Sequence, residues 1–249
     1  MKINFLLVII IVSITSLAAQ KTVTTEEQAW LGFFNQTRFS NRWGSWMDLH
    51  LRLKDDFVGD LSQLIVRPGL TYYVTDDVRL TAGYAYVHHF PAAGHADIAQ
   101  PEHRPWQQVQ WFMRWPKVRL MQWVRLEERF RRKIRSDSEL AEGYNFNYRI
   151  RYNFALFLPL TKKGLAPGGL QFLLNDELHV NFGKKIVYNV FDQNRLFAGL
   201  VYQLNPHAQL HAGYMNLYQQ LPAGNKFRNQ HTIRLFYFHN LDWRKGENH

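Results

Sequence analysis

The stretch from Tyr144 to Phe157 alternates apolar and polar residues almost without interruption. A period of two places successive side chains on opposite faces, so this pattern predicts a strand rather than a helix. Its 14 residues are many for a strand of a soluble domain, where about 5–6 is usual. A strand that crosses a membrane needs about 9–11 residues. With Tyr148 and Ile150 facing lipid and Arg149 and Arg151 facing a polar interior, the stretch predicts a transmembrane antiparallel β-barrel.

Residues 1–19 have the features of a secretory signal peptide. Lys2 precedes an apolar run from Phe5 to Val12, and small residues lead to a cleavage site after Ala18 or Ala19. No later run approaches the roughly 18–20 apolar residues that a membrane helix requires. A membrane protein without such helices has to cross as a closed barrel. We therefore expect residues 20–249 to form a single barrel domain that is exported to the bacterial outer membrane.

Composition restricts the chemistry further. The chain has no Cys, which excludes disulfides, thiolate metal sites, a cysteine nucleophile and a lipid anchor on cysteine. The formal net charge is +10, but the arginines fall at alternate strand positions rather than in helical stripes or tails, which points to a barrel interior rather than to nucleic acid. Aromatic residues make up 15% of the chain, as suits the aromatic girdles of a barrel.

Strand-like segments follow one another along the chain, and their connections alternate in length. The segments are Trp30–Phe39, Trp46–Lys54, Gln63–Val74, Val78–His88, Arg104–Arg114, Val118–Phe130, Tyr144–Phe157, Leu170–Phe182, Gln193–Leu204, Ala208–Gln219 and Gln230–Phe238. Short turns rich in Asn, Asp and Pro alternate with long polar loops such as His89–His103 and Arg131–Gly143. Leu158–Gly169 is an exception, since it is too long for a short turn. The alternation predicts short periplasmic turns and longer extracellular loops.

The number of strands follows from how a barrel closes. Eleven segments would leave the first and last strands parallel, whereas antiparallel closure needs an even number. A further short strand within Lys21–Gln28 would restore an even number, so we expect about twelve strands, with about ten as the alternative.

Two hairpins also echo each other: Gly69 to Val74 and Leu80 to Tyr84 recur 130 residues later as Gly199 to Leu204 and Leu210 to Tyr214. One echo is too little for a repeat architecture.

The inner face predicted from strand parity is strongly polar. A charge on the lipid face costs roughly 2–4 kcal/mol per Arg at the midplane, so these groups belong in the lumen. The candidate site residues, which would form a polar network or bind anions, are Arg119, Arg125, Glu127, Arg129, Arg149, Arg151, Asn175, Glu177, His179 and Arg195. They are compatible with two interpretations. One is an Arg/Glu/Asn/Gln network that fills a narrow barrel; the other is a basic channel or pocket for an anionic solute or the phosphates of a lipid headgroup.

Other classes of function have less support. A barrel phospholipase would need a Ser near a His with an orienting partner; His179, Asn175 and Glu177 share one face, but no Ser falls on the neighbouring strands. His88, His89, His95 and His103 surround one loop without the spacing of a defined metal site. The sequence has no Gly-rich phosphate loop and no groove-reading helix. We therefore expect no enzymatic activity, no cofactor, no metal and no nucleic-acid partner.

Several short motifs, in order, resemble one known family. They are Glu102-x-Arg104-x-Trp106-Gln107-Gln108, Arg125-x-Glu127-x-Arg129, Arg149-x-Arg151-Tyr152, Asp176-Glu177, Gln193-Asn194-Arg195 and Ala212-Gly213-Tyr214-Met215. Together they are similar to the DUF2490 family of Bacteroidetes-type outer-membrane proteins, over Trp30 to Phe238. The resemblance implies a β-barrel of unknown function and supplies no catalytic residue.

These observations lead to one functional expectation with alternatives. We expect a monomeric outer-membrane barrel that is a small passive pore or a structural protein, in contact with membrane lipid and possessing an Arg-rich polar lumen. The alternative is a barrel that binds a lipid or a small anionic ligand, and a lipid hydrolase is the remote alternative.

Overall fold

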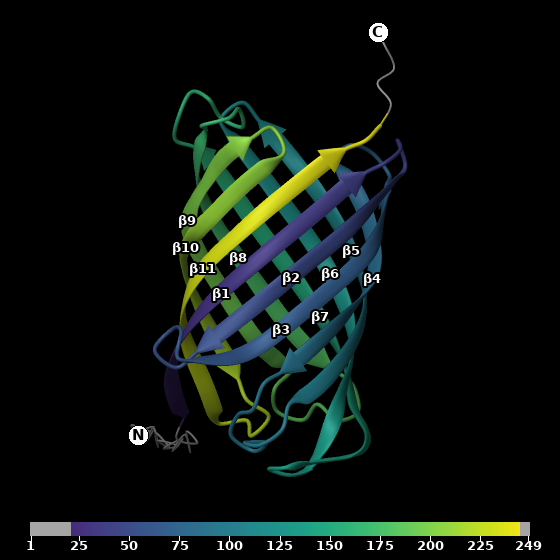
Figure 1. Cartoon of the computed structure of the whole chain (residues 1–249), viewed down its shortest axis with the longest axis vertical. Helices are drawn as coiled ribbons and strands as arrows, with labels where there is room; N and C mark the ends of the chain where they lie inside the picture. The colour runs from purple at the N-terminus through teal and green to yellow at the C-terminus, as the bar shows by residue number, and fades with distance from the viewer. Residues whose placement is uncertain (1–20, 245–249) are drawn as a thin grey trace, which may run out of the picture.

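The computed structural model describes residues 21–244, which form a closed all-β barrel (Figure 1). Its eleven strands within that range are β1 (Thr22–Arg38), β2 (Trp43–Lys54), β3 (Asp60–Tyr73), β4 (Val78–His89), β5 (Gln100–Trp115), β6 (Val118–Ser136), β7 (Glu139–Pro159), β8 (Leu170–Phe182), β9 (Phe191–Asn205), β10 (Ala208–Gln220) and β11 (Lys226–Asp242). Each pairs with its sequence neighbours in antiparallel register. The closed all-β barrel that the sequence predicts is therefore confirmed. The predicted signal peptide lies outside the described residues.

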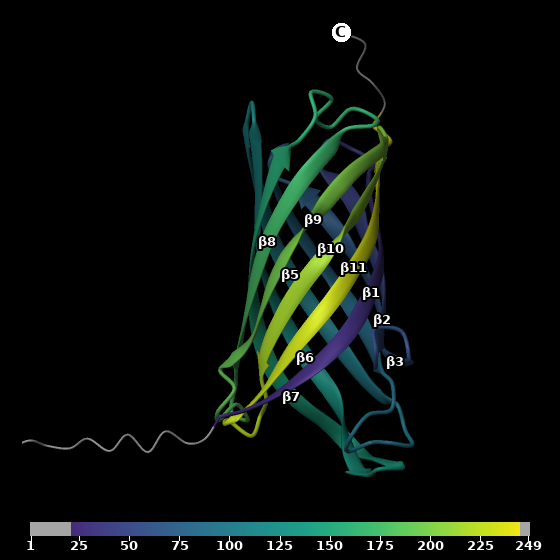
Figure 2. The ribbon, with the colours of Figure 1, turned by 90° about the vertical axis from the view of Figure 1, so that its left-hand side faces the viewer.

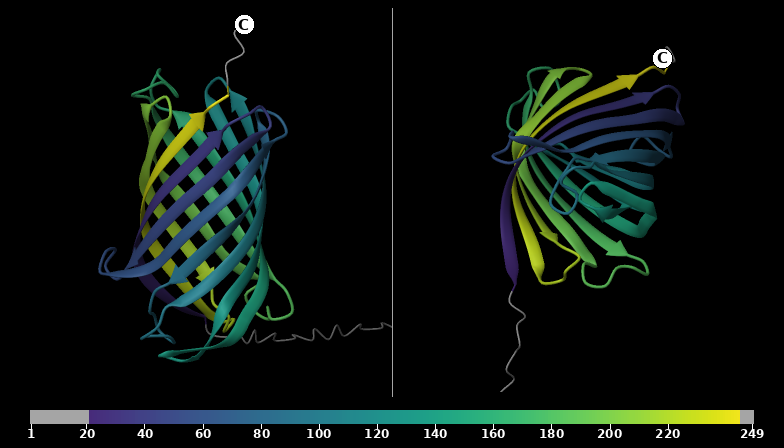
Figure 3. Two further views of the ribbon diagram at one scale, coloured as in Figure 1. Left: turned by 45° about the vertical axis from the view of Figure 1, so that its right-hand side comes forward. Right: turned by 60° about the horizontal axis from the view of Figure 1, so that its bottom comes forward.

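The expected strand number of about twelve is wrong for residues 21–244, as is the alternative of ten. The segment expected to contain a separate short strand is the start of β1, which continues without a turn from Thr22 to Arg38. No Gly, Pro or Asn interrupts the stretch from Thr22 to Leu31, so nothing in it breaks the strand. The barrel closes instead by a parallel pairing of β1 with β11, from Thr22 opposite Lys226 to Arg38 opposite Asp242 (Figure 3).

The barrel has two rims, which we name after the two ends of the described range, residues 21–244. The N-terminal rim, where β1 begins, carries the connections 55–59, 90–99, 137–138, 183–190 and 221–225. The C-terminal rim, where β11 ends, carries 39–42, 74–77, 116–117, 160–169 and 206–207. The long connection expected at Leu158–Gly169 is observed at residues 160–169. The loop expected at Arg131–Gly143 is mostly strand, because β6 and β7 continue as a hairpin that extends past the other strands (Figure 2).

The two faces of the wall differ in chemistry as strand parity predicts. Apolar side chains such as Leu80, Val124, Ile150 and Leu196 are exposed on the outside. Exposed aromatic residues mark strand ends, with Trp43 and Trp115 at the C-terminal rim and Phe182 at the N-terminal rim, together with Trp243 and Tyr188 in the adjoining segments. The buried charged and amide side chains of the strands lie on the opposite, inner face.

The echoed hairpins build two glycine platforms inside the barrel. Gly69 lies opposite Gly83 in the β3–β4 pair, and Gly199 lies opposite Gly213 in the β9–β10 pair. A Cβ on Gly83 would lie 2.2 Å from the carbonyl oxygen of Pro68 and 2.9 Å from the ring of Trp106. A Cβ on Gly199 would lie 2.5 Å from the ring of Phe197. Each glycine pair therefore lets a buried aromatic ring lie directly against the backbone.

Within residues 21–244, there is no helix with the length and apolar character needed to cross a membrane.

A two-zone lumen as the candidate functional site

All ten residues that the sequence selects lie on the inner side of the barrel. Eight of them are buried, and Arg119 and Arg129 are half-buried. Strands β6, β7, β8 and β9 supply the set because these neighbouring strands each present alternate residues inward. The structure divides the ten between two zones of the lumen that differ in how their arginines are neutralised.

The zone toward the N-terminal rim is an ion-pair network. Arg149 donates to Glu127 at 2.9 Å and to Asp192 at 2.9 Å, and Arg151 donates to Glu127 at 2.7 Å. Arg151 also donates to Glu177 at 2.7 Å through Nε. Arg195 reaches Glu177 at 3.4 Å. This zone is therefore a network of arginines and acidic residues, with each carboxylate held by guanidinium groups.

A second cluster of the same zone surrounds Glu102, which is fully buried. Arg104 and Arg129 donate to its Oε1 at 2.6 Å and 2.7 Å, and His89 Nε2 lies 2.8 Å from its Oε2. These partners come from β4, β5 and β6. The Glu102 cluster therefore fixes three adjacent strands to one another at the N-terminal end of the lumen.

In the zone toward the C-terminal rim, arginines contact aromatic rings instead of carboxylates. The guanidinium carbons lie over aromatic rings: Arg119 over Phe157 at 4.1 Å, Arg125 over Trp106 at 4.3 Å and Arg234 over Phe197 at 3.4 Å. None of the three forms an ion pair with a carboxylate of the described chain. Each also has one guanidinium nitrogen without a hydrogen-bond partner among residues 21–244, namely Nε of Arg119 and Arg234 and Nη1 of Arg125. Cation–π contact partly compensates such charges without satisfying their hydrogen bonds.

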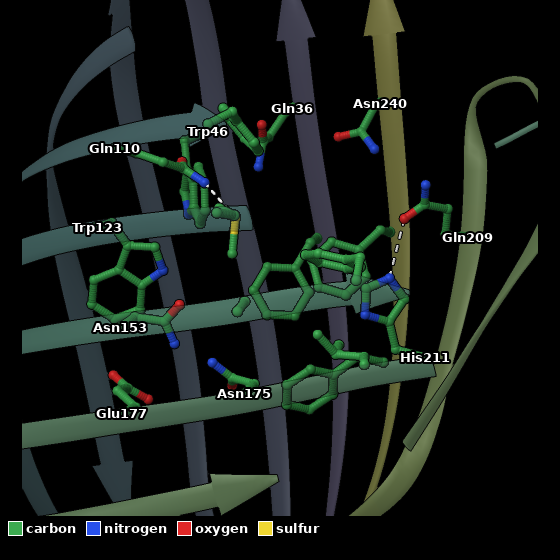
Figure 4. Close-up of a pocket in the computed structure, with 18 of the residues that line it drawn as sticks. Gln36, Trp46, Gln110, Trp123, Asn153, Asn175, Glu177, Gln209, His211 and Asn240 are labelled. Carbon is green, nitrogen blue, oxygen red and sulfur yellow. Dashed lines mark hydrogen bonds between the residues drawn. The ribbon is translucent and has the colours of Figure 1, made fainter. Parts of the chain in front are cut away.

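A cavity of about 390 Å³ occupies this zone. Figure 4 shows Trp46, Trp123, Asn153, Asn175 and His211 arranged around it. Of its described lining residues, two carry carboxylates, Asp76 at the rim and Glu177. Both carboxylates are bonded to arginines. The hydrogen bond from Arg38 to Asp76, at 2.6 Å, lowers the pKa of the Asp76 carboxyl. We call this space the C-terminal cavity.

A second cavity of about 160 Å³, the N-terminal cavity, lies in the paired zone. Nine of its described lining residues are arginines and none is Asp or Glu: Arg52, Arg67, Arg104, Arg129, Arg131, Arg149, Arg151, Arg195 and Arg228. The carboxylates that pair with several of these arginines therefore lie behind them, and the guanidinium groups form the surface of the cavity.

The two cavities share five lining residues, which define a waist. They are Trp30, Arg52, Arg67, Arg151 and Arg195. Two guanidinium groups lie close to the Trp30 ring, with Arg52 at 3.6 Å and Arg195 at 5.0 Å from its centroid. Its Nε1 donates to Gln28 at 2.7 Å. Trp30 and the arginines around it therefore mark the place where the two cavities adjoin.

Sequence reasoning missed several of these lumen residues. Arg234, Trp106 and Trp30 are absent from the predicted set although all are buried in the interior. Arg234 stands at an inward position of β11, so its parity was a usable signal. Residue type did not predict the inward orientation of the two tryptophans, because a large aromatic residue can occupy either face of a barrel strand.

The histidines considered from sequence contact neighbouring polar and aromatic groups. His179 lies 3.0 Å from Glu177, and its Nδ1 lies 3.1 Å from Gln193 Nε2, so it is part of the network. His89 contacts Glu102, His95 bonds the carbonyl of Ile98, and His103 contacts the exposed ring of Tyr84. Within residues 21–244 no group of three or more His, Asp or Glu side chains is arranged to hold a metal ion.

The fold is a closed β-barrel of eleven strands within residues 21–244, with a polar lumen of two zones. A solved structure described as the NanC porin superimposes on this chain with a TM-score of 0.51 and 10% sequence identity, covering 86% of this chain and 99% of that one. At this identity the likeness concerns the fold alone.

The family model described as "Protein of unknown function (DUF2490)" matches residues 27–228. The chain belongs to the DUF2490 family, which confirms the family named from the motifs. A curated relative, an uncharacterised protein of Methylorubrum extorquens, is 29% identical over 164 residues. The match spans 64% of this chain and 64% of that relative's length. The Bacteroidetes origin suggested by the motifs stays a prediction.

Proposed function

We propose that this protein is an outer-membrane barrel that acts as a small pore for anionic solutes. The observation that carries the proposal is the surface of the two cavities: each presents nine arginines, and the few carboxylates nearby are already bound to guanidinium groups. Rings of Arg favour anions in pores because an anion replaces water as the partner of the positive groups. The apolar outer belt and its aromatic ends support the membrane location. The proposal includes no catalytic step and no oligomeric partner.

Bilayer recordings test this proposal. The purified protein, reconstituted into planar bilayers under a KCl gradient, is expected to give a reversal potential displaced toward that of chloride. Arg125→Gln should move this potential toward zero, since it removes a cavity charge without a carboxylate partner. Arg135→Gln is the matched control because Arg135 is exposed at the tip of the β6–β7 hairpin, where it pairs with Glu139. Cation preference, or an Arg125→Gln reversal potential equal to that of the unmodified protein, would contradict the proposal.

A closed barrel that binds a lipid headgroup or another anionic ligand is the second candidate. The waist at Trp30 favours it, because the tryptophan and its two guanidinium partners lie between the cavities. The two candidates differ in one measurement. A pore conducts in the absence of any ligand, whereas a closed barrel binds anions in detergent and gives no current.

The proposed orientation has the C-terminal rim in the periplasm. Four of its five connections contain two to four residues, whereas the N-terminal rim carries loops such as 90–99 and 183–190 and the projecting β6–β7 hairpin. Short periplasmic turns and longer outer loops are usual for such barrels. An epitope inserted after Gly94 should be accessible to antibody on intact cells, and one inserted between Pro206 and His207 should become accessible only after the outer membrane is permeabilised. The reverse pattern would overturn the orientation and leave the pore proposal standing.

A further inference from the structure

We propose that the C-terminal cavity is a binding site for anions that carry a flat apolar body, of which an aromatic carboxylate is the simplest case. This inference rests on the proposed function, because it names the class of anion that the lumen accepts. It comes from a structural unit that occurs twice in the barrel and from the difference between the two cavities.

The unit that occurs twice is a stack of glycine pair, aromatic ring and guanidinium group. Gly69 and Gly83 lie under Trp106, which lies under Arg125. On the other side of the barrel, Gly199 and Gly213 lie under Phe197, which lies under Arg234. The rings of Trp106 and Phe197 are almost completely buried, at 1% and 0% exposure. Each stack therefore fixes one arginine against a rigid support.

Both arginines of the stacks line the C-terminal cavity, and both retain unused hydrogen-bonding capacity. Arg125 is 2% exposed and Arg234 is 9% exposed. Arg125 Nη1 and Arg234 Nε have no hydrogen-bond partner in residues 21–244. A buried donor or charge without a partner is costly. A carboxylate bound against either guanidinium group would gain charge-assisted hydrogen bonds, which are the strong ones.

Aromatic rings near the same cavity supply the apolar part of the site. Phe34 stacks on Phe238 with centroids 4.3 Å apart, and it contacts Trp46 edge-on at 6.4 Å. Phe236 lies 5.2 Å from Phe34, and His211 lies 4.2 Å from Phe238. All of these side chains line the cavity. Rings packed in this way offer faces and edges to a further flat ring. The volume of the C-terminal cavity, about 390 Å³, falls in the range of about 300–1,000 Å³ that is usual for small-molecule sites.

The N-terminal cavity lacks this apolar wall. Its described lining is Arg, Gln, His and Ser apart from Trp30 at the waist and Leu217. A small hydrated anion suits such a surface, and it gains nothing from aromatic rings. The lumen therefore discriminates between anions by the cavity at the C-terminal end, where an apolar body is desolvated and the charge is held by stacked arginines.

Titrations in detergent test the site directly. Benzoate is added to the full-length purified protein while tryptophan fluorescence is recorded, since Trp30, Trp46 and Trp123 line the cavity. Acetate supplies the charge without the ring, and benzyl alcohol supplies the ring without the charge. We expect saturable binding of benzoate, roughly tenfold tighter than that of either comparison compound. Arg125→Gln and Arg234→Gln should each weaken benzoate binding roughly tenfold, while Arg135→Gln should leave it unchanged.

The outcomes separate this inference from the pore proposal. Equal affinity for benzoate and acetate, or benzoate binding unchanged in both cavity variants, would overturn the aromatic-anion site even if the pore selects chloride. Absence of anion-selective current with tight benzoate binding would instead overturn the pore and retain the site. Two arginine variants are used because one of them could fail to fold, and heat-modifiable migration on gels verifies the fold of each.

Discussion

At the scale of single residues, the contribution of each charged side chain in the lumen to stability depends on its partners. Glu127 is 1% exposed and accepts hydrogen bonds from both Arg149 and Arg151. Removing one member of a buried ion pair costs about 3–5 kcal/mol, because the remaining charge is left without compensation. The same reasoning does not hold for Arg125, which has no carboxylate partner to lose.

The first prediction concerns Glu127→Gln. We expect the free energy of unfolding to fall by about 3 kcal/mol, the lower end of the range for a buried pair, since a barrel lumen is partly hydrated. Urea titration in detergent, followed by tryptophan fluorescence, measures the loss. Glu128→Gln is the control, because the neighbouring residue presents the same group to the outer face. Equal stability of the Glu127 variant and the unmodified protein would contradict the network.

The second prediction concerns Trp30, whose ring lies close to Arg52 and Arg195 at the waist. Trp30→Ala removes a large side chain where the two cavities adjoin, so single-channel conductance should rise severalfold if the protein conducts. Trp115→Ala serves as the control, since Trp115 is 54% exposed at the C-terminal rim. An unchanged conductance would place the narrowest point of the lumen elsewhere.

At the scale of strands, the alternation of residue types predicts where strands lie better than it predicts how they pair. The alternation in β7 and β8 is a local property, and the predicted segment Leu170–Phe182 coincides with β8. The ends of β6 and β7 could not be predicted in this way, because Arg131, Arg132 and Arg135 look like a solvated loop although the backbone continues to pair. Parity likewise identified inward arginines, but it could not tell paired from stacked ones. That distinction depends on which side chain the neighbouring strands place beside each arginine, such as Phe157 of β7 beside Arg119 of β6.

The third prediction concerns the glycine platform of the β3–β4 pair. Gly83→Ala places a Cβ 2.2 Å from the carbonyl oxygen of Pro68, where the neighbour is backbone and cannot rotate away. Overpacking of this kind costs about 1–3 kcal/mol. The temperature at which the folded band disappears from gels should therefore fall. Ala82→Val, at the adjacent outward-facing position, should leave that temperature close to the original. Similar temperatures for all three proteins would show that the platform tolerates the added carbon.

At the scale of the whole molecule, closure is the property that the sequence analysis got wrong. Evenness follows only if every neighbouring pair is antiparallel, and the sequence contains no signal that assigns the last partner of β1. In the structure, β1 runs parallel to β11 along its whole length. This closure aligns Trp30 with Arg234 in the register and thereby connects the waist with an arginine of the C-terminal cavity. The direction of one pairing thus determines which residues share the lumen.

Engineered cysteine pairs test that direction, and the natural chain provides a clean background because it has no Cys. In the parallel register Leu31 lies opposite Leu235, and Val23 lies opposite Phe227. We expect Leu31→Cys with Leu235→Cys to cross-link under mild oxidation, and Val23→Cys with Phe227→Cys to do the same. An antiparallel pairing anchored at Leu31 and Leu235 would instead bring Val23 close to Trp243. Cross-linking of Val23→Cys with Trp243→Cys, and none with Phe227→Cys, would therefore refute the parallel closure and the lumen built on it, whereas the opposite result would establish both strands in the observed register.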